Sequence, residues 1–208
     1  MSRLIVLSET VSELHHKIRI SQQVRNDVRI WQAFLEGWNG RSVFLSRSVV
    51  EAHDLEFYTD AASTLGYGGI FRSAWFSHTW LSNQPWSIAI QELYPIVVAA
   101  AVWGSQWTGL RILVHCDNKP AVDALNKGYS NKRIMADILR VLMYYSMRHN
   151  FSIKGKHVEG KLNVKSDMLS RLQVKEFTAT FPGVDSQPTT VPEDVLDTSK
   201  IICGSSLL

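Results

Sequence analysis

Residues 55–80 read LEFYTDAASTLGYGGIFRSAWFSHTW, and this stretch decides the fold. Apolar and polar side chains alternate from Leu55 to Asp60, which predicts a half-buried strand that ends near Asp60. Glycines follow at positions 66, 68 and 69, where the chain turns or another segment approaches closely. They surround a second predicted strand, and residues 74–80 predict a third. Three consecutive strands with short connections predict an antiparallel meander.

Helices and strands alternate after the meander. The run from Leu110 to Cys116 is apolar apart from one Arg, as expected for a strand that is covered on both faces. The other predicted elements are helices over 88–103, 120–127, 131–148 and 164–172, and a strand over 151–158. The order β-β-β-α-β-α-α-β-α predicts an α/β fold. Its five-stranded mixed sheet would have three antiparallel strands and then parallel strands, with helices on both faces.

Two segments flank this predicted domain. Near the start, apolar side chains recur at three- and four-residue steps and predict a helix over 21–38 whose apolar stripe must dock on another surface; they are Val24, Val28, Trp31, Leu35 and Trp38. After residue 176 the chain is rich in Pro, Ser and Thr, which predicts a linker. We therefore divide the chain into a flanking part (1–50), a domain (51–173) and a flexible tail (174–208).

Composition excludes several classes of protein. The chain has 208 residues, of which 45% are hydrophobic and 20% charged, so it is neither wholly disordered nor fibrous. Two cysteines cannot build a disulfide framework, which favours a reducing compartment. The longest strongly apolar run, Leu93 to Trp103, is too short to span a bilayer, and no signal peptide is evident. We expect a cytoplasmic or nuclear protein without a membrane partner.

Positive charge is concentrated in one region. Residues 118–175 carry twelve Lys or Arg side chains and four Asp or Glu side chains. Lys154, Lys156, Lys161 and Lys165 surround the last predicted strand and helix. Such a cluster indicates a polyanionic partner such as nucleic acid, with phosphate contacts that weaken as salt rises. The alternative is an ordinary solvated Lys and Arg surface.

Acidic residues are sparse in the core-forming region. Between Tyr58 and Asp117 the only carboxylates are Asp60, Glu92 and Asp117, and each stands in an apolar neighbourhood. A buried, unpaired carboxylate is costly, so each needs a partner, a cation or a path to solvent. The alternative is three acids at the ends of elements, facing water.

Four carboxylates converge in the predicted fold. Asp60 ends the first strand, Asp117 ends the fourth, and Glu92 and Asp167 lie on flanking helices. Ligand sites in open α/β sheets lie at the carboxyl ends of parallel strands. Like charges ~4 Å apart repel by several kcal/mol, and a divalent cation relieves the repulsion. Oxygen ligands without a Cys/His cluster favour Mg²⁺, with Mn²⁺ able to substitute, and two such ions suit phosphodiester hydrolysis.

These residues resemble the ribonuclease H domain of retroelement reverse transcriptases. The matching pieces are YTDAAS at 58–63, QEL at 91–93, HCDN at 115–118 and HVEGKLNVKSDMLSR at 157–171. The resemblance spans about 55–172. Residues 31–42 and the Pro-containing tail resemble the segments beside this domain in tyrosine-recombinase (DIRS-type) retrotransposons. Residues 1–50 would then be a remnant of the connection from polymerase to ribonuclease H. The chain has no Tyr-x-Asp-Asp polymerase signature, so no synthesis activity is expected.

The resemblance implies a ribonuclease H-like fold and hydrolysis of the RNA strand of RNA/DNA hybrids. Asp60 would bridge two Mg²⁺ ions, Glu92 and Asp117 would hold one, and Asp167 the other. The products would carry a 5′ phosphate and a 3′ hydroxyl. Implied partners are the hybrid and the polymerase and tyrosine-recombinase parts of a retroelement polyprotein.

Two further residues have alternative roles. His157 would assist proton transfer or product release, or serve as a structural imidazole. Asn118 would contact a 2′-hydroxyl of RNA or cap the helix that begins near Pro120.

Two positions depart from the family pattern. Glu159 stands where proline is usual and adds negative charge near Asp167, and Ser166 stands where a small apolar residue is usual.

Two other functions stay open on sequence alone. A catalytically silent nucleic-acid-binding or assembly module would keep the same fold and lose the chemistry. A DNA-strand-transfer enzyme on a related fold fits less well, because such sites follow the order Asp-Asp-Glu, whereas here Glu92 precedes Asp117.

Overall fold

The computed structural model describes residues 15–38, 55–81 and 85–196, together with Leu7, Val11 and Glu13. Its centre is a five-stranded sheet in the order β3-β2-β1-β4-β5. The strands are β1 (Phe57–Ala62), β2 (Gly66–Phe71), β3 (Ala74–Thr79), β4 (Arg111–Cys116) and β5 (Ser152–His157). β1, β2 and β3 pair antiparallel, whereas β4 and β5 run parallel to β1. This is the ribonuclease H-like topology predicted from the sequence.

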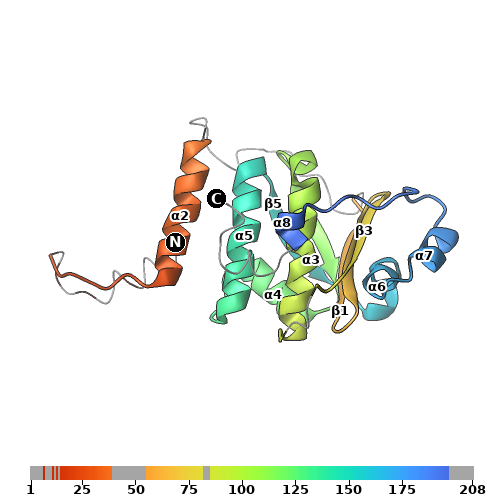
Figure 1. The fold of residues 1–208 in the computed structure, drawn as a ribbon, viewed down its shortest axis with the longest axis horizontal. Coiled ribbons are helices and arrows are strands. Elements are labelled where there is room, and N and C mark those ends of the chain that lie inside the picture. The colour runs from red at the N-terminus through yellow and green to blue at the C-terminus, as the bar shows by residue number, and fades with distance from the viewer. Residues whose placement is uncertain are drawn as a thin grey trace.

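Helices cover both faces of the sheet (Figure 1). One face carries the main core, formed with α3 (Ile88–Trp103), α4 (Lys119–Lys127) and α5 (Arg133–His149). The opposite face carries α6 (Val164–Ser170) and α7 (Val174–Thr180), whose Leu169 and Phe177 form a second cluster with two side chains from the sheet, Ile70 and Trp75.

The hairpin between β1 and β2 extends further than the sequence indicates. We expected the first strand to end near Asp60, but β1 continues to Ala62, because Asp60 pairs with Gly68 and Ala62 with Gly66. Gly68 also lets α6 approach the sheet: a Cβ at this position would lie 2.4 Å from Leu169 Cβ. Asp60 therefore lies inside a paired strand, on the face that α6 covers.

The central helix α3 is the most apolar element. The helical stretch Ile88–Trp107 is long and apolar enough, by length and composition, to cross a membrane, although the strongly apolar run counted from sequence is shorter. In the structure 78% of the relevant window is buried inside the protein, between the sheet and α5. Its apolar character is thus accounted for by the main core.

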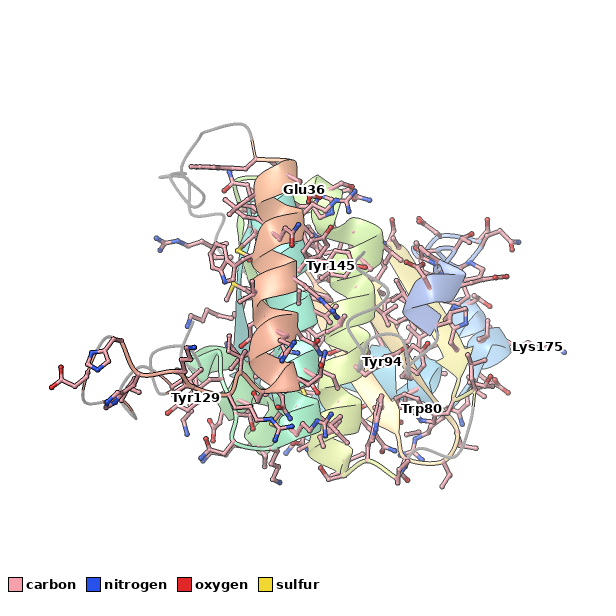
Figure 2. All side chains as sticks on the ribbon, turned by 60° about the vertical axis from the view of Figure 1, so that its left-hand side comes forward. Glu36, Trp80, Tyr94, Tyr129, Tyr145 and Lys175 are labelled. Carbon is pink, nitrogen blue, oxygen red and sulfur yellow. The ribbon has the colours of Figure 1, made fainter. Side chains whose placement is uncertain are left out.

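The helix predicted over 21–38 is α2 (Gln22–Glu36), with Ser21 as its N-cap. It lies beside α5 (Figure 2), where Val24 and Ile30 are buried and Asp27 forms an ion pair with Arg140. The predicted stripe does not dock as a whole: Val28, Leu35 and Trp38 are exposed. Val24 and Trp31 of the predicted stripe do pack inward, together with Ile30 from outside it. Residues 39–54 lie outside the described part of the chain.

The segment after residue 173 packs on the domain as far as it is described, although its composition predicts a linker. In α7, Phe177 is fully buried against Trp75. The chain then follows β3, where the Asp185 N–H donates to the Ser73 carbonyl (2.9 Å) and the Thr189 N–H to the Trp75 carbonyl (2.6 Å).

The segment 174–196, which we call the strap, ends on the other face of the sheet. There α8 (Glu193–Leu196) buries Val195 beside α3, and the Tyr94 hydroxyl donates to the Val195 carbonyl (2.5 Å). A few well-placed apolar side chains fix a segment that composition alone indicates to be mobile. Residues 197–208 lie outside the described residues.

Candidate metal centre

Strand register brings Asp60 and Asp117 to the same place. Tyr58 of β1 is the direct neighbour of His115 in the parallel strand β4, and their rings stack with centroids 4.5 Å apart. Asp60 and Asp117 each lie two residues further along. Because side chains alternate between the faces with a period of two, both carboxylates lie on the same face at the same end of the strand pair.

Two hydrogen-bond donors, one in α6 and one at its N-terminus, hold the Asp60 carboxylate, which is only 5% exposed. The Ser170 hydroxyl donates to Oδ2 (2.5 Å) and the Asn163 amide to Oδ1 (3.3 Å). Ser166 in turn donates to the Asn163 side-chain oxygen (2.6 Å). Both oxygens of the carboxylate are therefore held by buried groups, as is typical of metal-binding carboxylates and their supporting residues.

Glu92 reaches the same end of the sheet from the opposite face. It lies in the second turn of α3 and is 3% exposed. Its carboxylate accepts a hydrogen bond from the Ala61 backbone, and the Cys116 thiol donates to Oε2 over 3.6 Å. Helix α3 thus delivers a carboxylate to the carboxyl ends of β1 and β4.

The electrostatics of the cluster show how strongly these acids crowd one another. The pKa of Glu92 is raised to about 9, chiefly by burial and in smaller part by the charges of Asp60 and Asp117. The pKa of Asp60 is raised to about 6, chiefly by burial. The hydrogen bond from Ser170 lowers this pKa, and the charges of Asp117 and Asp167 raise it by smaller amounts. The pKa of Asp117 is raised by burial and by Asp167. In the absence of a cation, the site therefore disfavours the charged forms of these three carboxyl groups.

Asp167 lies at the open side of the cluster. It is in the first turn of α6 and its side chain is 40% exposed. Its Oδ1 accepts a hydrogen bond from Arg171 Nε (2.8 Å), and this contact raises the pKa of the guanidinium. Asp167 is close enough to raise the pKa values of Asp60 and Asp117, so all four predicted carboxylates belong to one electrostatic unit.

The donor set fits a divalent cation. Asp60, Glu92 and Asp117 offer hard oxygen ligands of high local negative charge, and a bound cation would remove the repulsion that raises their pKa values. Among the described residues, Glu92, Cys116 and Asp117 each offer a ligand atom, and these three atoms lie within 4.8 Å of one another. Asp60 is not in this group of described residues; it would hold the cation with Glu92 and Asp117, and Asp167 lies at the exposed side.

His157 and Asn118 flank Asp117. His157 is exposed at the end of β5, and its Nε2 lies 3.1 Å from the Asp117 carbonyl oxygen. Because a carbonyl only accepts, Nε2 carries the proton and Nδ1 is the acceptor nitrogen of the neutral ring. Asn118 caps α4: its Oδ1 accepts from the Ala121 N–H (3.1 Å). A 2′-hydroxyl contact would use the amide nitrogen, so capping and RNA contact are compatible.

The predicted lysines divide into two pairs. Lys154 and Lys156 stand on exposed positions of β5, and Lys156 is the strand neighbour of His115, on the face that carries Asp60 and Asp117. Lys154 donates to the Asn126 carbonyl (3.0 Å). Lys161 and Lys165 form ion pairs instead, with Glu159 (2.5 Å) and with Glu56 (3.1 Å) respectively.

The ion pair with Lys161 bears on one departure from the family pattern. Lys161 pairs with Glu159 and so offsets the negative charge that this departure adds. The other departure, Ser166, supports Asn163 and through it Asp60.

The patterns used in the sequence did not identify Asn163 and Ser170 as supports of Asp60. A signal was present: Asn163, Ser166 and Ser170 recur at three- and four-residue steps, which places three polar side chains on one face of a helix. Asp60 lies more than one hundred residues earlier in the chain, so its contact with Asn163 and Ser170 follows only from the packing of α6 on β1.

The chain matches no protein-family model, and a search of curated proteins finds no similar sequence.

Proposed function

We propose that this protein is a metal-dependent endonuclease that hydrolyses the RNA strand of RNA/DNA hybrids, as the ribonuclease H part of a retroelement reverse transcriptase similar to those of DIRS-type elements. One observation carries the proposal. Three buried or half-buried carboxylates, Asp60, Glu92 and Asp117, meet at the carboxyl end of β1 and β4 with pKa values raised by burial and mutual repulsion.

Such a cluster is costly for folding, which favours a functional explanation. Each carboxylate loses hydration on burial, and the Ser170 and Asn163 hydrogen bonds to Asp60 compensate only in part. Perturbed pKa values concentrated at one end of a sheet are typical of functional sites. A bound divalent cation would supply positive charge to stabilise the developing negative charge on phosphoryl oxygens.

Three residues around the carboxylates are suited to contact the RNA/DNA hybrid. Lys156 lies on the same face of the sheet as Asp60 and Asp117 and suits contact with a phosphate of the hybrid backbone. The exposed His157 ring, oriented by its Nε2–H bond to the Asp117 carbonyl, presents Nδ1 to accept a proton near the reacting phosphate. Asn118 suits recognition of the 2′-hydroxyl that distinguishes RNA from DNA.

One contact favours the alternative, a catalytically silent nucleic-acid-binding module. The Arg171 guanidinium forms an ion pair with Asp167 and occupies one oxygen of a carboxylate that the enzyme would use for a cation. Arg171 is 53% and Asp167 40% exposed, and ion pairs that solvent reaches to this extent contribute little free energy. A cation of charge +2 competes effectively with this contact.

The decisive experiment uses the full chain with a labelled RNA/DNA hybrid in Mg²⁺, beside single-stranded RNA, duplex RNA and duplex DNA of the same sequence. We expect cleavage of the RNA strand of the hybrid, with 5′ phosphate and 3′ hydroxyl ends. Asp60→Asn and Asp117→Asn should each lower the rate by about 100-fold or more, as expected for loss of a group that stabilises charge at the reacting centre.

Asp123→Asn is the matched control, because Asp123 is an exposed aspartate on α4 and should leave the rate unchanged. Hybrid binding without cleavage in both Mg²⁺ and Mn²⁺ would establish the silent module instead. Cleavage confined to duplex DNA would favour the strand-transfer alternative.

A further inference from the structure

The candidate centre contains a sulfur atom as well as carboxylates. Cys116 is the last residue of β4, is fully buried, and directs its thiol to Glu92 Oε2 at 3.6 Å. Its Sγ also accepts the Asn118 N–H over 3.4 Å. With an Asp117 oxygen, the three ligand atoms lie within 4.8 Å of one another. The donor set expected from the sequence contained oxygen alone, but the contact between Glu92 of α3 and Cys116 of β4 adds a thiol.

The distance between sulfur and oxygen matches the edge of a tetrahedral metal site. Zinc binds thiolate sulfur at ~2.3 Å and carboxylate oxygen at ~2.0–2.2 Å, and at a tetrahedral angle these bonds place sulfur and oxygen about 3.6 Å apart. The thiol proton now bridges Cys116 and Glu92 at that separation. A metal ion between the same two atoms needs little change in backbone position.

We propose that Glu92, Cys116 and Asp117 form a binding site for thiophilic divalent cations of the Zn²⁺ and Cd²⁺ class, which compete with Mg²⁺ for the two carboxylates. The inference deepens the proposed function and rests on it only in that both use Glu92 and Asp117. As the sulfur–metal bond forms, the S–H bond breaks, the thiol proton passes to solvent and no electron is transferred. Three protein ligands leave a fourth position open to water.

Ligand preference predicts opposite effects of the two kinds of cation. Mg²⁺ prefers oxygen ligands in octahedral geometry and gains nothing from sulfur, whereas Zn²⁺ and Cd²⁺ bind thiolate strongly. A thiophilic ion would draw Glu92 and Asp117 toward Cys116, on the α3 side of the sheet and away from Asp60. The cation that binds more tightly would therefore hold the site in an inactive arrangement.

The test uses Co²⁺ as a spectroscopic probe of the zinc site and Cd²⁺ as a second probe, with the purified full chain. Cys203, the other cysteine of the chain, provides the matched variant, since Cys203→Ser leaves Cys116 as the single thiol. We expect the thiolate-to-metal charge-transfer absorption at one metal per chain in the wild type and in Cys203→Ser. It should disappear in Cys116→Ser, with Cd²⁺ affinity lowered by about 100-fold or more, since loss of even an outer-shell partner costs ~10–100-fold.

Cys203→Ser makes the test independent of whether the core variant Cys116→Ser folds. If Cys203→Ser shows no thiolate absorption, or if Cys116→Ser retains it, the inference is wrong. Hybrid cleavage in Mg²⁺ without a thiolate signal overturns this inference alone. A thiolate signal assigned to Cys116 in a protein that does not cleave the hybrid overturns the proposed function and leaves the thiophilic site standing.

Discussion

Ser170 on α6 donates a hydrogen bond of 2.5 Å to the Asp60 carboxylate on β1. Both side chains are buried, and the bond joins the helix that carries Asp167 to the strand at the centre of the candidate site. A hydrogen bond of this kind both stabilises the packing of α6 and fixes the orientation of the carboxylate that we propose binds the cation.

Ser170→Ala should therefore affect stability and metal binding together. Loss of a buried hydrogen bond to a charged group lowers the free energy of unfolding by about 1.5–3 kcal/mol. Loss of a supporting partner lowers metal affinity by about 10–100-fold. Urea unfolding and calorimetric Mg²⁺ titration at pH 8 measure the two effects.

Ser77→Ala is the control for Ser170→Ala. Ser77 also links the sheet to α6, because its hydroxyl donates to the Leu169 carbonyl (2.6 Å), but this bond does not involve Asp60. This variant should lose stability and keep its Mg²⁺ affinity. Equal losses of affinity in both variants would contradict the assigned role of Ser170.

Without divalent cations, the protein should lose stability as pH rises. The pKa of Glu92 is about 9 in the folded state and 4.5 at its ordinary value, so between these pH values the folded state binds a proton that the unfolded chain has released. Stability therefore falls with rising pH across this window. Asp60 acts in the same direction between its ordinary value of 3.8 and about 6. Melting temperatures from pH 4.5 to 9 in EDTA measure the slope.

Glu92→Gln should flatten that slope and should melt at a higher temperature than the wild type at pH 8, while losing hybrid cleavage. The exposed Glu176 on α7 offers the control substitution Glu176→Gln, which should keep the wild-type slope. A steep slope that persists in Glu92→Gln would show that other groups control the pH dependence.

Gly68→Ala should displace α6 from the sheet. The added methyl group would lie 2.4 Å from Leu169 Cβ and 2.9 Å from the Leu169 backbone carbon. We expect a loss of stability of about 1–3 kcal/mol, as for other overpacked sites, together with weaker Mg²⁺ binding, because α6 carries Ser170 and Asp167. At Gly183 a Cβ meets nothing within 4 Å, so Gly183→Ala is the control and should change neither quantity.

The strap over residues 174–196 should contribute to folding. Phe177 is fully buried against Trp75, and Phe177→Ala should lower the free energy of unfolding by about 3–5 kcal/mol. Phe181, at the end of the same helix, is only partly buried, so Phe181→Ala should cost clearly less. Chemical unfolding of the full chain compares them, and equal costs would contradict the larger contribution assigned to the buried Phe177.

The fold could be predicted because local patterns and topology agree. Alternation over 55–60, the glycine positions after it and the apolar run 110–116 each indicate an element that the structure contains. The end of β1 was misplaced, because the pairing of Ala62 with Gly66 extends the strand and depends on the hairpin partner. On α2, periodicity identified an apolar stripe, but only part of it docks: Val24 is buried, whereas Val28 is exposed.

The candidate site could be predicted only in part. Isolated acids in apolar segments identified Asp60, Glu92 and Asp117, because a carboxylate in such a position requires a physical explanation. The supports of Asp60 and the thiol beside Glu92 could not be foreseen in the same way. These contacts join α6 to β1 and α3 to β4, and no local pattern encodes the distance between two packed elements.

The central claim is that repulsion within this carboxylate cluster is relieved by a divalent cation. Its most direct test is the melting temperature at pH 8 with and without Mg²⁺, in the wild type, Asp60→Asn and the exposed control Asp123→Asn. A cation that binds only the folded state raises the melting temperature by mass action. We predict a clear rise in the wild type and in Asp123→Asn, and little or none in Asp60→Asn. An equal rise in all three proteins, or no rise in the wild type, would contradict the account.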